Sequence, residues 1–318
     1  MKIQSVAILG AGAVGSYVIW GLSQKEEIEL GVIAEGERKE RLQQNGCKIN
    51  GKVYRPNVWT PKEACGVDLL IVALKYGALP EAMESIHKAV GEHTIVMSLM
   101  NGVNSEELIA KHIGKEKLLY SLIKVASHKE NDEYIFEPAT TIGIIFGEQT
   151  QPYQSERVKA VGELFENTGI HYRVTEDIME EIWSKFRLNV CNNLPQAILG
   201  AGVGCYEDSI HMNAIREGLR QELEAIAQAK GIDLSKVSAT SLHGSAVKKN
   251  ARFSTLQDLD AGRHTEIDMF SKTLADMGKE LGIATPYNEF TYHMIKALEE
   301  KNDGIFDYTN DTEATCSK

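Results

Sequence analysis

The sequence has little cysteine, and its cysteines and histidines form no ligand pattern. The chain of 318 residues has five cysteines, an odd number at wide spacings with no C-x-x-C pair. It therefore predicts neither a disulfide framework nor a zinc knuckle. The nine histidines include no HxxxH or HxH pair, and we expect no metal site. Reduced thiols, and a start that runs from Met1 straight into a strand-like segment, predict a cytoplasmic protein without a signal peptide.

An excess of positive charge and a long apolar run are also missing. The 34 Lys and Arg against 45 Asp and Glu give a net charge of −11, which argues against nucleic acid or an anionic membrane as partner. The longest apolar stretch, Leu69–Leu74, is too short to cross a bilayer. With 43% hydrophobic and 25% charged residues, the chain has the composition of a globular protein, and its length suggests two domains.

The first half of the chain alternates apolar strand-like runs with helical stretches. Four runs are predicted as strands, at Val6–Leu9, Leu30–Ala34, Val67–Leu74 and Thr94–Leu99. Continuous apolar strands joined by helices are typical of a parallel sheet covered on both faces. Two further runs, Thr140–Phe146 and His171–Val174, are expected to extend or edge that sheet.

The second half carries helical periodicity instead. A first apolar stripe consists of Ile210, Ala214, Leu219, Leu223, Ile226 and Ala227, and a cleaner one of Ile267, Phe270, Leu274, Met277 and Leu281. The spacing predicts amphipathic helices, the second ended by Gly282 and Pro286. We therefore predict an α/β domain over residues 1–176 and an all-helical domain over residues 177–318. The long stripes leave room for a homodimer interface.

A glycine-rich turn follows the first strand. Its residues, Gly10, Ala11, Gly12, Ala13, Val14 and Gly15, match GxGxxG at the start of a helix. In this motif the first glycine permits the tight turn and the second lets a pyrophosphate approach the backbone. The third lets the helix pack closely on the strand. A ligand-free glycine turn is the weaker alternative, so residues 1–176 read as a Rossmann-type dinucleotide-binding domain.

The residues after the second strand bear on the choice between NAD and NADP. Glu35 stands 25 residues after Gly10, where a carboxylate accepts hydrogen bonds from the adenosine ribose and repels a 2′-phosphate. Arg38, Lys39 and Arg41 follow at once and are long enough to reach such a phosphate. A solvated charge run is an equally good interpretation of these three cations.

A lysine and two asparagines line up near the start of the second domain. Lys185, Asn189 and Asn193 are spaced i, i+4 and i+8, so a helix places them along one face, while Ile182, Phe186 and Val190 would be core. Asparagine is a poor helix former, and its repeated use invites a functional explanation. From the spacing alone, a solvated polar face explains the ladder equally well.

Three more candidates stand at loop or stripe borders. Asn101, followed by Gly102, comes directly after the fourth strand, and Lys75 directly after the third. Ligands bind at such carboxyl ends of parallel strands, although Asn-Gly is also a common turn. Glu266 precedes Ile267 and would lie about 100° round the helix from the apolar stripe.

Taken together, these residues resemble the ketopantoate reductase family over nearly the whole chain. The shared features are GAGAVG, Lys75, the Met100-Asn101-Gly102 turn, the W-x-K-x-x-x-N-x-x-x-N helix from Trp183 to Asn193, and the blocks Ser254–Asp258 and Arg263–Asp268. The resemblance implies reduction of a small 2-keto acid, ketopantoate, to D-pantoate by NADPH in pantothenate synthesis. It also implies an active site in the cleft between the two domains.

The resemblance further implies a role for each matching residue. Lys185 matches the catalytic lysine and Glu266 the essential active-site glutamate. Lys75 and Asn101 match residues that position cofactor and substrate, Asn189 and Asn193 match amides that hold the substrate hydroxyl, and Ser254 matches a serine that binds the substrate carboxylate. A lysine ammonium that protonates the alkoxide acts only where charge develops in the transition state.

Two departures from the family pattern keep other functions open. Ala251 stands where a further substrate-binding asparagine is expected, and Glu35 stands where the family often has arginine. Both favour the nearest alternative, an NAD-dependent D-2-hydroxyacid dehydrogenase acting on branched or aromatic 2-keto acids. A non-catalytic nucleotide-binding regulator is a third interpretation, but it has no need for Lys185, Glu266 and the amide ladder together.

Overall fold

The computed structural model describes residues 2–237 and 248–306. The chain divides into two compact units, Met1–Ile182 and Trp183–Lys318, and helix α6 (Ile178–Leu188) contains the point of division. A domain boundary at residue 176 stays a prediction. No helix among the described residues is long and apolar enough to span a membrane.

Among the residues described before α6, three sheets and five α-helices build the N-terminal unit. The strands are β1 (Ser5–Leu9), β2 (Glu29–Ile33), β3 (Cys47–Ile49), β4 (Lys52–Tyr54), β5 (Asn57–Trp59), β6 (Leu69–Val72), β7 (Ile95–Ser98), β8 (Tyr120–Lys124), β9 (Ser127–Glu130), β10 (Glu133–Phe136), β11 (Gly143–Gly147) and β12 (Tyr172–Val174). The helices are α1 (Ala13–Leu22), α2 (Gly36–Asn45), α3 (Leu79–Ala89), α4 (Ser105–Ile113) and α5 (Glu156–Phe165). The main sheet is parallel, in the order β5-β2-β1-β6-β7.

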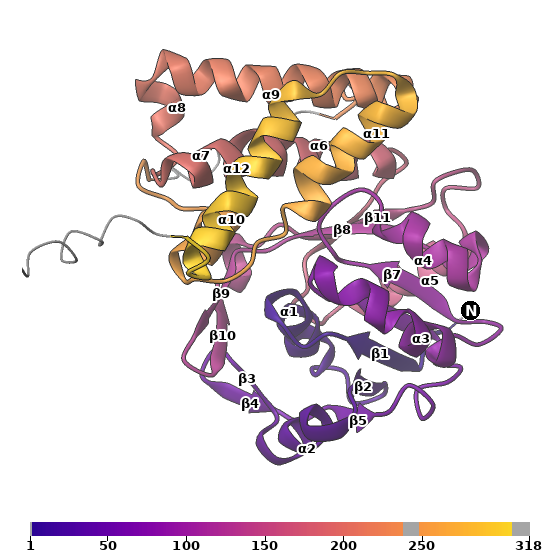
Figure 1. Cartoon of the computed structure of the whole chain (residues 1–318). Helices are drawn as coiled ribbons and strands as arrows, with labels where there is room; N and C mark the ends of the chain where they lie inside the picture. Colours follow the sequence, from indigo (N-terminus) through magenta and orange to yellow (C-terminus); the bar gives the residue numbers. More distant parts are fainter. Residues whose placement is uncertain (1, 238–247, 307–318) are drawn as a thin grey trace, which may run out of the picture. The chain divides into compact units, whose positions relative to one another are not determined.

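The main sheet is buried on both faces, as continuous apolar strands predict. Val6 and Ile8 of β1 pack into one core with α1, whereas Ala7 and Leu9 point into a second core with α3 and α4. Figure 1 shows these helices beside the sheet, in the indigo to purple part of the chain. The predicted Rossmann-type α/β fold is confirmed, with β1 at the centre of the sheet and its glycine turn at the carboxyl edge.

The two later strands of this unit do not join the main sheet. They are β11 and β12, which pair with β8 in a separate three-stranded sheet. A parallel bridge of Val96 with Leu118 links the chain before β8 to β7. The prediction that Thr140–Phe146 and His171–Val174 extend or edge the main sheet is wrong, because the antiparallel pairing of β8 with β11 takes up the first of these strands.

The C-terminal unit is helical, as predicted. Its helices after α6 are α7 (Leu194–Leu199), α8 (Cys205–Asp208), α9 (Ile210–Ala229), α10 (Ser254–Asp260), α11 (Thr273–Leu281) and α12 (Pro286–Asn302), with π-helical turns η4 (Asn189–Asn193) and η6 (Asp268–Lys272). Figure 1 draws α9 in orange beside the yellow α12, and the two helices pack together.

The predicted stripes are mostly core, with three exceptions. Leu219, Leu223, Ile226 and Ala227 of α9 and Ile267, Phe270, Leu274 and Met277 are buried. Ile210 and Ala214 are exposed instead, because the first turns of α9 bury Met212. Leu281 is also exposed, at the last residue of α11 before Gly282 turns the chain with a φ of 70°.

Candidate active site

The glycine turn after β1 is tightly built at its first and third glycines. Gly10 has a φ of 110°, and a Cβ there would stand 2.5 Å from the carbonyl oxygen of Ala73. A Cβ on Gly15 would stand 1.9 Å from the carbonyl oxygen of Gly10. Both positions therefore exclude any side chain, as the close packing of this motif requires.

Gly12 differs from Gly10 and Gly15, because the packing of the protein leaves room for a side chain there. A Cβ at Gly12 would meet no atom within 4 Å. Gly12 is the N-cap of α1, and no side chain caps the helix there, so the first N–H groups and the positive end of the helix dipole offer themselves to an anion. An open approach to uncapped N–H groups fits the pyrophosphate of a dinucleotide.

Other predicted residues follow the strands on either side of β1. Glu35 is exposed and is the N-cap of α2, after β2. Lys75 is the N-cap of a short 3-10 turn, Tyr76–Ala78, after β6. Half-buried Asn101 follows β7, where Gly102 turns the chain with a φ of 92°. Because β2, β1, β6 and β7 are parallel neighbours, these residues share one edge of the sheet with the glycine turn.

A buried carboxyl supports the turn that carries Asn101. Glu106 in the first turn of α4 is 4% exposed and accepts a hydrogen bond of 2.7 Å from the Ser105 hydroxyl. The Ser105 hydroxyl is 2.8 Å from that of Ser98, at the end of β7, and Ser121 donates to the Ser98 carbonyl. Burial raises the pKa of Glu106 to about 7. This network was not predicted from the sequence, because three serines around one buried glutamate leave no periodic signal.

The lysine helix departs from a regular α-helix at its asparagines. Lys185 is half-buried in α6, and Ile182, Phe186 and Val190 are core as predicted. Residues Asn189–Asn193 form the π-helical turn η4, so the predicted helix continues through both asparagines but widens there. π-Helical turns inside helices frequently occur at functional sites. The amide nitrogen of Asn193 donates to the amide oxygen of Asn189 across 3.3 Å.

A tyrosine from a later helix explains the irregularity. Pro195 has no N–H, and the N–H of Gln196 donates to the Tyr206 hydroxyl at 3.1 Å. That hydroxyl donates in turn to the carbonyl of Asn192 at 2.6 Å. The Tyr206 oxygen thus stands between two backbone groups that a regular helix would join directly, and such an insertion bends a helix.

The C-terminal unit brings the segments with the predicted substrate residues together. The turn η4 packs against α10, which begins at Ser254, and against η6, which begins two residues after Glu266. Ser254 is exposed, and Glu266 is half-buried. Glu266 lies in a bend before η6, not on the helix that carries the stripe, because the π-helical turn starts only at Asp268. The positions of Lys185 and Glu266 relative to the glycine turn stay a prediction.

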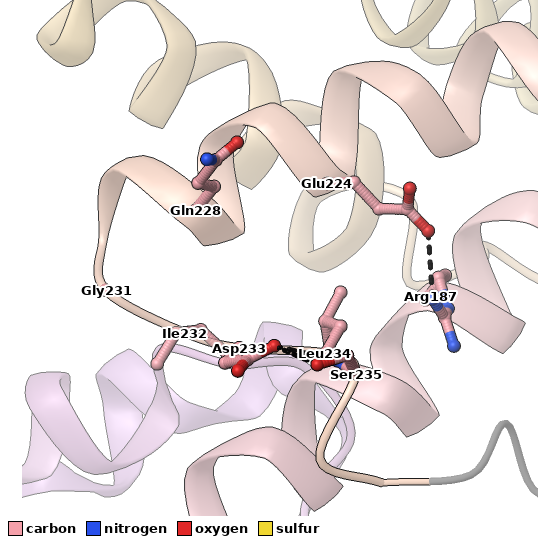
Figure 2. Close-up of a pocket in the computed structure, with 8 residues that line it drawn as sticks. All are labelled: Arg187, Glu224, Gln228, Gly231, Ile232, Asp233, Leu234 and Ser235. Carbon is pink, nitrogen blue, oxygen red and sulfur yellow. Dashed lines mark hydrogen bonds and ion pairs between the residues drawn. The ribbon is translucent and has the colours of Figure 1, made fainter.

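A pocket of about 510 Å³ lies elsewhere in the same unit. It is bordered by the loop after α9 and by Arg187 and Glu224, which form an ion pair of 2.8 Å (Figure 2). Asp233 and Ser235 bond to one another on its other side. None of the residues predicted for the site lines this pocket, so its size is no guide to the chemistry.

Comparison with known proteins covers both units. A family model described as ketopantoate reductase PanE/ApbA matches residues 6–147, and the one described as its C terminal matches residues 177–299. A 2-dehydropantoate 2-reductase of Pyrococcus horikoshii is 27% identical over 308 residues, which cover 94% of this chain and 99% of the relative.

Solved structures give the same result for the fold. That of 2-dehydropantoate 2-reductase from Geobacter metallireducens GS-15 has a TM-score of 0.76 and 26% identity, covering 92% of this chain and 99% of its own. D-mandelate dehydrogenase with NADH and anilino(oxo)acetate has a TM-score of 0.82 and 22% identity, covering 94% of this chain and 100% of its own. The second likeness shows a shared fold alone.

Proposed function

Because the chain belongs to the ketopantoate reductase family, we propose that it is a nicotinamide-dependent 2-dehydropantoate 2-reductase, which reduces ketopantoate to D-pantoate in pantothenate biosynthesis. One observation carries the proposal beyond the family match. The turn with Asn189 and Asn193 packs against both the helix that starts at Ser254 and the turn that follows Glu266. The segments that carry an amide pair, a hydroxyl and a carboxylate thus pack together, which suits a small, polar substrate.

The chain's own residues have separate tasks in this reaction. When bound, the reduced nicotinamide supplies the hydride. Lys185 would hold the keto oxygen by its ammonium and give a proton to the alkoxide that develops there. Glu266 would orient that ammonium or a substrate hydroxyl. Asn189 and Asn193, which already share a hydrogen bond, would hold a hydroxyl, and Ser254 would bind the carboxylate.

Gly10 to Gly15, Lys75, Asn101 and Glu35 would hold the cofactor, and the residues after β2 support NADH as the preferred one. Glu35 is exposed at the start of α2, where it would repel a 2′-phosphate. Of the three cations that follow, Lys39 already pairs with Glu63 at 2.7 Å. The alternative is NADPH, which the family resemblance implies.

One experiment tests the substrate and the cofactor together. Initial rates are compared for ketopantoate and 2-ketoisocaproate, each with NADH and with NADPH. The proposal expects ketopantoate to have the higher kcat/KM with either cofactor. A higher value for 2-ketoisocaproate would favour the D-2-hydroxyacid dehydrogenase, which Glu35 and Ala251 support. Cofactor binding without turnover of any 2-keto acid would indicate a regulator.

Assembly and location are proposed on fewer observations. Phe290 and Tyr287 near the start of α12 are 60% and 44% exposed, which is unusual for large aromatic side chains and supports a homodimer. Sedimentation analysis of the wild type and of a Phe290→Ser variant tests this. The four described cysteines are free, which supports a cytoplasmic location.

A further inference from the structure

A buried glutamine links the amide turn to the loop before Ser254. Gln196 in α7 is 0% exposed, and its side chain uses both ends. The amide nitrogen donates to the carbonyl of Ala251 at 2.9 Å, and the amide oxygen accepts from the N–H of Phe253 at 2.9 Å. No hydrophobic core needs a glutamine, so full burial with both ends satisfied indicates a specific task.

The backbone of the same glutamine is tied to the amide turn. Its N–H reaches the carbonyl of Asn192 through the Tyr206 hydroxyl. Gln196 is thus linked to the turn with Asn189 and Asn193 through its backbone N–H, and to the residues directly before Ser254 through its side chain. The span between the two predicted substrate-binding groups is therefore set by covalent geometry and by four hydrogen bonds.

The loop before Ser254 has a second support that does not involve a side chain. Val203 N–H donates to the Ala251 carbonyl at 3.0 Å. A Cβ on Gly202 would stand 2.3 Å from the carbonyl oxygen of Lys249, so the two backbones approach as closely as they can. Ala251 uses its carbonyl for both supports, and its methyl group offers no hydrogen bond to a substrate.

From this geometry we infer that Gln196 is a positioning residue, which fixes Ser254 at the distance from Asn189 and Asn193 that the keto acid requires. The inference rests on the proposed function. Gln196 touches neither substrate nor cofactor. It acts through Ser254, and a misplacement of a substrate-binding group by about 1 Å costs up to about 100-fold in rate.

The test uses Gln196→Met, which keeps the volume and removes both side-chain bonds. We expect KM for ketopantoate to rise about tenfold or more, with KM for the nicotinamide cofactor unchanged. In a Ser254→Ala background the same change should add little, because the two residues act on one contact. Glu222→Met is the matched control. Glu222 is also buried and holds the N–H groups of Tyr287 and Asn288, so its loss should lower stability with KM for ketopantoate unchanged.

Hydrogen exchange of the Phe253 amide provides a readout that needs no turnover. We expect this amide to exchange faster in Gln196→Met than in the wild type, and to exchange at the wild-type rate in Glu222→Met. Unchanged exchange, or full additivity with Ser254→Ala, overturns the inference while the reductase function stands. If the wild-type chain turns over no 2-keto acid, the proposed function is overturned. Faster exchange of the Phe253 amide in Gln196→Met would then still support the link between Gln196 and the loop before Ser254.

Discussion

Glu106 gives the chain a pH-dependent stability that runs opposite to that of most carboxylates. Burial raises its pKa from 4.5 to about 7, so the folded protein favours the neutral form. Its stabilising contribution is complete below pH 4.5, the unfolded value, and is lost as the pH rises through about 7. A difference of 2.5 pKa units corresponds to about 3 kcal/mol in total, of which about 2.5 kcal/mol falls between pH 5 and pH 8.

The variant Glu106→Gln isolates this contribution. Glutamine is neutral at every pH and keeps the acceptor for Ser105. The free energy of unfolding is measured by urea denaturation at half-unit steps between pH 5 and pH 8. The difference between variant and wild type should increase by about 2.5 kcal/mol from pH 5 to pH 8, because only the wild type loses the contribution of Glu106. Glu81→Gln, at an exposed position in the first turn of α3, is the control and should follow the wild type. Parallel curves for Glu106→Gln and wild type would refute the reasoning.

Three further changes test the site. A Cβ in Gly12→Ala meets no protein atom within 4 Å, so the melting temperature should be unchanged. The same Cβ would stand where the pyrophosphate approaches, so dinucleotide affinity should fall about tenfold or more. Calorimetry compares this variant with Gly77→Ala, whose Cβ also meets open space. Tyr206→Phe leaves a buried N–H and a carbonyl unpaired and should cost about 2–4 kcal/mol of unfolding free energy, and a cost near zero would contradict the explanation of the π-helical turn. Glu35→Gln should raise NADPH affinity relative to NADH about tenfold, as expected for one like-charge repulsion at a surface, and an unchanged ratio of dissociation constants would remove Glu35 from cofactor choice.

The sequence predicts best what depends on neighbouring residues. The apolar run in β1 and the glycines after it act within a few residues, and the closeness of Gly15 to Gly10 is built into the motif. The central strands are recognisable because both of their faces are buried. For the same reason β9, with exposed Lys129 and Glu130, gives no apolar signal, and strands of this kind were not predicted.

The irregular parts of the site depend on distant residues. The carbonyl of Asn192 in the π-helical turn accepts a hydrogen bond from the hydroxyl of Tyr206, which comes from another helix. In the sequence Gln196 has no feature that separates it from an ordinary helical residue, because its partners Ala251 and Phe253 are more than 50 residues away. Periodicity records only which face of a helix is apolar, so it predicts the buried Ile182, Phe186 and Val190. It predicts neither the π-helical turn nor the hydrogen bonds of Gln196.

The proton-donor role of Lys185 is the central claim, and the Lys185→Ala variant tests it most directly. Turnover of ketopantoate is measured with and without added ethylammonium, and dinucleotide affinity is measured alongside, with exposed Lys279→Ala as the control. We expect kcat to fall about 10²–10⁴-fold, dinucleotide affinity to be unchanged, and the added amine to restore part of the rate. Turnover equal to that of the wild type would contradict this claim.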